Sequence, residues 1–437
     1  MSSPRLRDPL RRAPFRRVAF SYAVNELGDW LGLIALSVLV FDRTGSALAT
    51  ALLFLGTGVV PALLTPVFVA RLERPPPRFV LPAIYAGEAA AFCGLALLSQ
   101  HFSLAAVVIV AAVDGALALT ARTLTRAVTA AMLEPEGELR AGNAILNVAF
   151  TGGAAVGPAA AGAMVAAFGV QSALLLDAFS FYAIAWILFT AKLPRTEPEP
   201  GRLREQLRAG LGYIRDNATL KRLLGAQAAA FVFFSAVIPI EVVYAKDTLG
   251  AGDTGYGVML GCWGIGMVLG SVVFATLRRA PLPVLLFFST VTIGAGYLGM
   301  AAAQTLAVAC AASALGGAGN GVQWVAVVSA VQELTAAPMQ ARVLSVLESS
   351  GSAMPAVGYV LGGLIASAYS TRAAFLFAGA GVVATAILAA PLLGRRWPAQ
   401  PAAEGLEADV AEDEVMVELI PAISSGVADK PSTANRR

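Results

Sequence analysis

The chain has 437 residues, of which 57% are hydrophobic and only 14% are charged, and its formal net charge is +3. Soluble domains contain roughly 45–50% apolar and about 25% charged residues, so this composition excludes a water-soluble fold. The net charge follows the membrane topology described below and does not indicate nucleic-acid binding. The composition predicts a polytopic membrane protein whose surroundings are a lipid bilayer, with no nucleic-acid partner.

Twelve apolar stretches each have about the 20 residues that a helix needs to cross a bilayer. The breaks between them fall where charged residues, Pro or Gly cluster. The stretches must be helices, because lipid offers backbone groups no hydrogen-bond partners and the alternation typical of barrel strands is absent. The expected spans are about 17–41, 47–70, 79–99, 103–132, 141–167, 171–191, 220–245, 254–277, 281–302, 305–333, 342–369 and 372–394.

The chain repeats itself. PVFVARLERPP (66–76) aligns with SVVFATLRRAP (271–281), and VGPAAAG (156–162) aligns with VGYVLGG (357–363). This repeat predicts two pseudo-symmetric six-helix bundles. We expect a basic cytoplasmic N-terminus, a first bundle, a cytoplasmic linker, a second bundle and an acidic, disordered cytoplasmic tail, at 1–16, 17–191, 192–219, 220–395 and 396–437.

The linker carries an apolar stripe on an otherwise basic helix, made of Leu203, Leu207, Leu211 and Ile214. Such a stripe suits an amphipathic helix on the inner membrane surface. The alternative is a simple connection between the bundles.

The positions of Lys and Arg predict the orientation. With a cytoplasmic N-terminus, most of them lie on the inner side, and the outer loops receive only Arg43, Lys246 and Arg372. The positive-inside rule therefore predicts that both termini are cytoplasmic. The first apolar run is too long for a signal peptide and lacks a small-residue cleavage site, so we expect it to be retained. The Ala- and Arg-rich composition suggests a bacterium, so the expected location is the bacterial cytoplasmic membrane.

Few residues are suited to metal or enzyme chemistry. Cys93, Cys262 and Cys310 lie inside spans without metal-ligand spacing, and the single histidine, His101, lies in an outer loop. The P-loop pattern GxxxxGK[ST] is missing, so the sequence indicates no ATP site. We expect no enzyme activity, no metal and no cofactor, which leaves secondary transport.

Residues 126–162 carry the most specific motif. RAVTAAMLEPEGELRAGNAILNVAFTGGAAVGPAAAG follows the pattern Arg, then Leu-x-Pro-Glu, then Leu-x-x-x-Asn, then Gly-Pro and a closing Gly. Over about 16–395 the chain resembles the major facilitator superfamily, in the branch of macrolide exporters, enterobactin-type siderophore exporters and transmembrane secretion effectors. The resemblance implies the major facilitator fold of twelve helices, with the first, fourth, seventh and tenth lining a central cavity. We expect a monomer.

The loop after the second span departs from the family pattern Gly-x-x-x-Asp-Arg. Pro66 and Ala70 occupy the Gly and Asp positions, so only Arg71 of the charge pair remains. The usual gating role of this loop is therefore open. Glu73, or an acid from the other bundle, is the alternative partner of the arginine.

The fifth and eleventh spans combine proline with small residues. Small residues at four-residue spacing let helices approach closely, and proline removes one helical hydrogen bond and permits a bend. We interpret both helices as hinges between the bundles, with ordinary tight packing as the alternative. The residues are Gly153, Gly157, Pro158 and Gly162 in the fifth span, similar to an exporter-associated pattern, and Pro355, Gly358, Gly362 and Gly363 in the eleventh.

Two carboxylates lie near the middle of the first span. Glu26 and Asp29 are three residues apart and therefore share one helix face. Each charge costs roughly 2.5–3.5 kcal/mol to insert at the bilayer centre, which makes a functional role the default interpretation. We predict that Glu26, assisted by Asp29, carries the coupling proton or binds a cationic substrate. The alternative is an ion pair with an arginine of the fourth span that holds the bundle together.

The fourth span carries Asp114, Arg122 and Arg126, broadly on one face. Arg122 is the predicted partner of the two carboxylates, with substrate contact as an alternative. Arg126 aligns with an arginine of the family near the inner end, where we expect a structural or gating ion pair. Glu88 and Asp177 belong to the third and sixth spans, and for them we expect structural pairing.

The second bundle offers Glu241 on the seventh span and Asn320, Gln323 and Trp324 on the tenth. Amides and one indole among apolar walls suit a cavity that binds bulky, amphiphilic molecules. Each of these residues is equally open to bonding with a neighbouring helix. Glu348 of the eleventh span is open between a gate and packing.

These features predict a proton-coupled exporter of an amphiphilic organic compound, such as an antibiotic, another toxic agent, a secondary metabolite or a siderophore, that works by alternating access. One alternative is an importer or uniporter of a small metabolite. Another, from a different class, is a non-transporting membrane scaffold or sensor whose tail recruits a partner.

Overall fold

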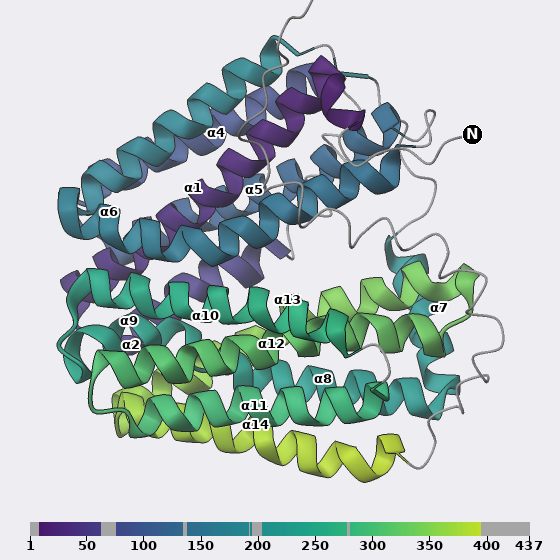
Figure 1. Cartoon of the computed structure of the whole chain (residues 1–437). Helices are drawn as coiled ribbons and strands as arrows, with labels where there is room; N and C mark the ends of the chain where they lie inside the picture. Colours follow the sequence, from purple (N-terminus) through teal and green to yellow (C-terminus); the bar gives the residue numbers. More distant parts are fainter. Residues whose placement is uncertain are drawn as a thin grey trace, which may run out of the picture. The chain divides into compact units, whose positions relative to one another are not determined.

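The structure is a computed structural model, and it describes residues 8–62, 76–133, 138–191, 193–194, 203–277 and 280–394. All of the described secondary structure is helical, which confirms the expected all-α class (Figure 1). The chain divides into two units, Met1–Arg395 and Arg396–Arg437. Several expectations lie outside the described residues, namely those for the tail, for Arg71 and Glu73, and for the side chains of Leu203, Leu207 and Glu348.

The first bundle follows a short helix, η1 (Asp8–Arg11). Gly169 interrupts its last helix with φ 79° and ψ 163°, a conformation that glycine adopts readily, so that helix comprises the fifth and sixth spans. The elements are α1 (Ala13–Thr44), α2 (Ala47–Phe54) with its continuation η2 (Leu55–Val59), α4 (Pro77–Leu98), α5 (Leu104–Leu133) and α6 (Leu139–Phe189).

The second bundle is reached through the linker helix α7 (Leu203–Asp216). Asn217 begins the next helix, because its side chain accepts hydrogen bonds from the amides of Thr219 and Leu220. Pro239 lacks the N–H that would continue that helix, and the seventh span breaks there. The elements are α8 (Ala218–Ser235), η4 (Ile238–Ile240), α9 (Glu241–Val243), η5 (Tyr244–Thr248), α10 (Gly252–Thr276), α11 (Leu282–Ala302), α12 (Leu306–Leu334), α13 (Ala337–Ala368) and α14 (Thr371–Gly394).

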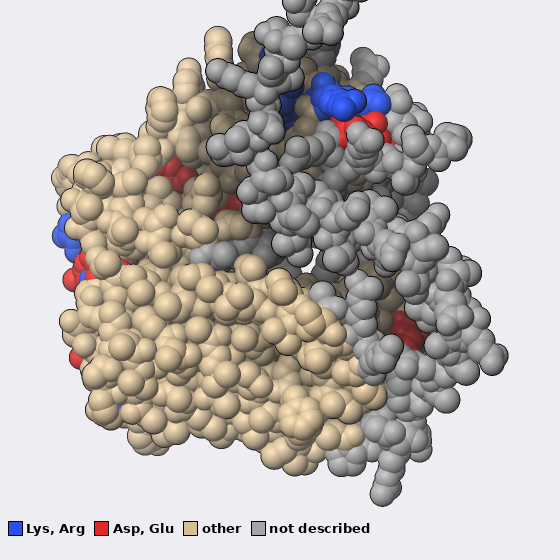
Figure 2. Space-filling model, viewed as in Figure 1, with Lys and Arg blue, Asp and Glu red and all other residues tan. Residues whose placement is uncertain are grey.

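The helices account for all twelve expected spans. Ten of them are long and apolar enough to cross a membrane, and two shorter apolar helices cover Ala47–Ala62 and Ala141–Phe150, in the second and fifth spans. On the described surface in this view, Lys and Arg atoms lie toward the two ends of the helices, a few Asp or Glu atoms are visible between them, and other residues form most of the face (Figure 2). This distribution suits helices that lie in lipid.

Consecutive spans run in opposite directions, so the turns at Gly45, Gly169 and Gly250 lie at one end of the helices, which we call the Lys246 end. Arg12 and α7 lie at the other, the Arg12 end. Figure 1 shows the Lys246 end on the left and the Arg12 end on the right.

The two bundles make close contacts toward the Lys246 end. A methyl group added to Gly162 on α6 would lie 2.6 Å from the Gly257 Cα on α10, so the two backbones touch at a glycine pair. Lys246 of the second bundle pairs with Asp253, at 2.7 Å, and with Asp42 at the end of α1. Glycine packing and an ion-pair group therefore join the bundles here.

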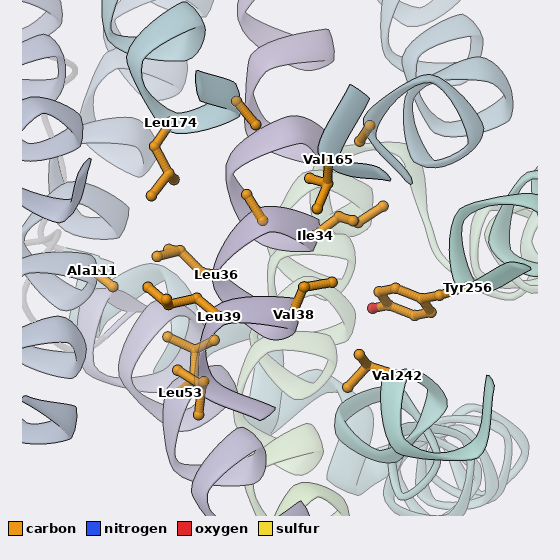
Figure 3. Close-up of a cluster of buried hydrophobic side chains, with 14 of the residues drawn as sticks. Ile34, Leu36, Val38, Leu39, Leu53, Ala111, Val165, Leu174, Val242 and Tyr256 are labelled. Atoms are coloured by element: carbon orange, nitrogen blue, oxygen red, sulfur yellow. The ribbon is translucent and has the colours of Figure 1, made fainter. Parts of the chain in front are cut away.

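The apolar core is continuous across this junction. Side chains from α1, α2, α5 and α6 converge with Val242 and Tyr256 of the second bundle, as Figure 3 shows. Ile34, Val38 and Leu53 are among its fully buried members. This shared core holds α1, the helix that carries Glu26 and Asp29, between the two bundles.

Candidate functional site

One arginine holds the two carboxylates of α1. The Nη2 atom of Arg122 on α5 lies 3.2 Å from Glu26 Oε1 and 3.2 Å from Asp29 Oδ2. The side chain of Glu26 is 3% exposed, whereas those of Asp29 and Arg122 are 29% and 32% exposed. The structure thus brings three of the predicted site residues together, and Asp29 and Arg122 form the partly exposed side of the group.

The surroundings of this triad come from α1 itself and from α6. Asn25 Nδ2 donates a hydrogen bond of 3.1 Å to Asp29 Oδ2. The Phe150 ring centre lies 5.8 Å from the Arg122 guanidinium carbon, in range for a cation–π contact. Neither neighbour was expected from the sequence, although the spacing of four residues between Asn25 and Asp29 places them on one helix face.

Glycines of α6 allow α1 to approach the site. A methyl group on Gly153 would lie 3.1 Å from Glu26 Cβ, and one on Gly157 would lie 2.7 Å from the Trp30 ring. The first two small residues of the predicted hinge therefore hold the helix that carries the carboxylates. Pro158 lies inside α6, one residue further on.

The triad has an excess of negative charge. Two carboxylates share one guanidinium, so the ionised group carries one negative charge that no described cation offsets. Uncompensated charge away from water is costly. A proton or a cationic group placed beside the carboxylates would remove this excess.

The other predicted residues of the first bundle do not join the triad. Arg126 is exposed, and within the described chain no ion pair forms to it. Asp114 has a buried Oδ1 atom without a hydrogen-bond partner. For Glu88 and Asp177 we expected structural pairing, but the described residues provide no cationic partner for either.

The amides of the second bundle bond to neighbouring helices. Gln323 Nε2 donates to Gln227 Oε1 at 2.8 Å, and Asn320 Nδ2 lies 3.6 Å from the sulfur of Met267. Trp324 is 43% exposed. A small cavity beside these three residues has a volume of about 30 Å³, enough for about one water molecule.

Glu241 lies apart from the triad, at the start of α9 beyond the Pro239 break. It is 7% exposed, and it interacts electrostatically with Tyr256 and Tyr297. Among the described residues, no Lys or Arg pairs with it.

The glycines of the eleventh span are contact points. A methyl group on Gly358 would lie 2.0 Å from Ser235 Oγ, and one on Gly362 would overlap the carbonyl of Ala236, directly after α8. Gly363 faces Ala51 of the first bundle, at 2.9 Å from its added methyl group. Close packing explains these residues, together with Pro355 inside α13, and a hinge role remains a proposal.

A cavity at the Arg12 end does not contain the triad. It measures about 1030 Å³, and Arg12, Phe15, Arg78 and Phe189 form part of its wall. Phe15 and Glu26 are eleven positions apart on α1, or roughly 16 Å at 1.5 Å per residue. We assign this cavity no role in substrate binding.

Comparison with known proteins identifies the family. A family profile described as transmembrane secretion effector, of the major facilitator type, matches residues 6–419. The uncharacterized MFS-type transporter YfiS of Bacillus subtilis (strain 168) is 24% identical over 394 residues, which cover 86% of this chain and 92% of that protein.

Solved structures show the same fold. The nucleoside transporter NupG superposes with a TM-score of 0.72 at 10% identity, covering 87% of this chain and 99% of its own. A bacterial homologue of the iron transporter ferroportin, in an inward-facing state, gives a TM-score of 0.67 at 16% identity, covering 87% and 98%. At such identities the likeness concerns the fold alone.

Proposed function

Because the chain belongs to the transmembrane secretion effector family of major facilitator transporters, we propose that it exports an amphiphilic organic compound in exchange for protons. One observation carries this proposal. Glu26 and Asp29 lie beside the midpoint of α1 (Ala13–Thr44) and share the single cation Arg122. Midplane sites of this kind are where secondary transporters bind substrate and coupling ions.

In the proposed cycle, a proton and the substrate compete for the triad. With the site open to the cytoplasm, Glu26 releases a proton with the assistance of Asp29, and the excess negative charge favours a substrate with a cationic group. The bundles then rock so that the site faces outward. A proton returns to the carboxylates, offsets the charge and displaces the substrate.

The orientation in this proposal places the Arg12 end in the cytoplasm. The basic N-terminal segment supports it, since positive charge favours the inner side. In this orientation the ion pairs of Lys246 lie at the outer end, and the proposed cycle requires the substrate to reach the triad from the Arg12 end.

The proposal can be tested in everted membrane vesicles with an inside-acid proton gradient. Amphiphilic antibiotics and dyes are added one at a time while the gradient is followed with a pH-sensitive dye. We expect one or more compounds to collapse the gradient in wild-type vesicles, and this response to disappear in Glu26→Gln and to weaken in Asp29→Asn.

The matched control is Asp216→Asn, because Asp216 is a carboxylate exposed on α7 and far from the triad in sequence. Its response should equal that of the wild type. Retention of the full response in well-inserted Glu26→Gln protein would remove Glu26 from the mechanism. Movement of a compound out of the vesicles together with the protons would instead favour import of a small metabolite.

A further inference from the structure

Three more carboxyl groups lie inside the first bundle, behind the triad. Glu88 on α4 and Asp177 on α6 are both 0% exposed. Both oxygens of Glu88, Oδ1 of Asp114 and Oδ2 of Asp177 are buried without a hydrogen-bond partner in the described structure. No Lys or Arg of the described chain lies within ion-pair distance of these groups, so their charge, when present, is uncompensated.

Asp177 reaches α1 next to Asp29. A methyl group on Gly28 would lie 2.3 Å from Asp177 Oδ1, and one on Gly32 would lie 3.0 Å from Asp177 Oδ2. These glycines precede and follow Asp29 by one and three residues, so they form a notch that seats the carboxyl within one turn of it. Ser180 Oγ donates a hydrogen bond of 3.2 Å to Oδ1 and leaves Oδ2 free.

Glu88 lies on the same level of the bundle. It stands between Tyr85 and Phe92 on α4, and the Phe181 ring, one turn after Asp177, packs against both rings at 6.3 Å and 5.3 Å. The Phe92 ring also borders the Gly32 notch. These contacts direct the α4 face that carries Glu88 toward α6 and α1.

Asp114 closes the group from α5. Leu117, one turn further along α5, contacts Gly87 beside Glu88, so Asp114 lies on the side of α5 that packs against α4. Charge interactions connect Glu88 with Asp114, Asp29 and Asp177.

The charged and titratable groups that face this region come from every helix around it. The carboxyl groups outnumber the cations, because Arg122 is the described guanidinium that pairs here, and both of its contacts go to the triad. The groups are Tyr22, Glu26 and Asp29 of α1, Tyr85 and Glu88 of α4, Asp114 and Arg122 of α5, and Asp177 of α6.

We propose that Glu88, Asp114 and Asp177 bind protons and exchange them with Asp29, forming a buried carboxyl chain that supplies the triad. A buried carboxylate without a partner costs several kcal/mol, and proton binding removes that cost. Each step moves one proton from a carboxyl group to the next carboxylate, directly or through a bridging water molecule, so that one O–H bond forms for each O–H bond that breaks. Asp29, 29% exposed, is the end that exchanges with water or substrate.

The inference deepens the proposed function and rests on it for the use of the protons, but its test needs no substrate. Purified full-length protein in detergent is titrated from about pH 5 to about pH 9, while infrared difference spectra record the C=O band of protonated carboxyl groups. We expect a titrating band that loses the intensity of about one group in Glu88→Gln and in Asp177→Asn. Asp42→Asn, which changes a carboxylate paired with Lys246 at the protein surface, should leave the band unchanged.

Two further samples guard against misfolded variants. Wild-type protein grown with carboxyl-labelled aspartate should shift the aspartic acid part of the band without any substitution. Gly28→Ala, which pushes on Asp177 but keeps every carboxyl, should move the Asp177 component in frequency. If the C=O bands do not change with pH, the carboxyl groups are permanently protonated. If no labelled acid band appears, they are ionised throughout. Either result overturns the proposal. If the carboxyl groups titrate as expected but no compound drives proton movement in the vesicles, only the proposed function is contradicted.

Discussion

At the scale of single residues, Arg122 has the clearest predicted effect on stability, because it is the described cation that pairs with both Glu26 and Asp29. Arg122→Ala leaves Glu26, 3% exposed, without its cation. Removing one partner of a fully buried pair costs roughly 3–5 kcal/mol. Since Arg122 and Asp29 are about one-third exposed, we expect about 2–3 kcal/mol, measured as the free energy of unfolding by denaturant in detergent micelles.

The matched control is Arg126→Ala, one turn along α5, where the side chain is exposed and forms no described ion pair. It should change the free energy of unfolding by less than about 0.5 kcal/mol. Adding Glu26→Gln to Arg122→Ala should recover part of the lost stability, because it removes the orphaned charge. Equal losses in the two arginine variants would show that the triad is not what Arg122 stabilises.

The triad was predictable from residue spacing, whereas the carboxyl chain behind it was not. Glu26 and Asp29 share a face by helical periodicity, and Arg122 was the deepest arginine of the fourth span. The position of Asp177 depends on a notch between two glycines of α1, which only the packing of α6 reveals. Sequence reasoning therefore assigned Asp177 a structural pair that the described residues do not contain.

At the scale of the elements, hydropathy predicted every span, because lipid imposes one length and one backbone conformation on all of them. The break of the seventh span at Pro239 and the π-helical turn after it were not expected. In the sequence, a proline near the end of an apolar run looks like the normal end of a span. That the helix resumes after Pro239 as far as η5 involves contacts of η5 with α1 and α10. The sequence thus predicted where the helices lie, but it did not predict the interruption of the seventh span.

The contact between α6 and α10 gives a prediction at this scale. In Gly162→Ala the new methyl group would lie 2.6 Å from the Gly257 Cα, a backbone atom that cannot rotate away. The helices must separate, and overpacking of this kind typically costs about 1–3 kcal/mol. We expect that loss in the free energy of unfolding. Gly152→Ala on the same helix has open space around its methyl group and should stabilise by up to about 1 kcal/mol; comparable losses in both would contradict a contact-specific effect.

At the scale of the whole membrane unit, the conformation is set by which ends of the bundles touch. The Lys246 end is held by Asp42, Asp253 and the glycine contact of α6 with α10. The Lys246–Asp42 pair joins the two bundles, whereas Asp253 lies in the same bundle as Lys246; the pair with Asp42 is partly exposed and contributes at most about 1 kcal/mol. A difference of that size changes a two-state population about fivefold, so this pair biases the opening of this end without locking it.

Lys246→Gln should therefore raise the population opened at this end about fivefold. Ser37, which is 0% exposed on α1 and lies toward Tyr256 at the junction, reports opening when replaced by cysteine in protein without Cys93, Cys262 and Cys310. Its reaction with a membrane-impermeant thiol reagent should accelerate by that factor in Lys246→Gln. Lys221→Gln, at the opposite end, should leave the rate unchanged. High salt should reduce the difference between the labelling rates of Lys246→Gln and wild type, because screening already weakens the ion pairs in the wild type. A labelling rate that changes neither with Lys246→Gln nor with salt would show that apolar packing, and not the ion pairs, keeps this end closed.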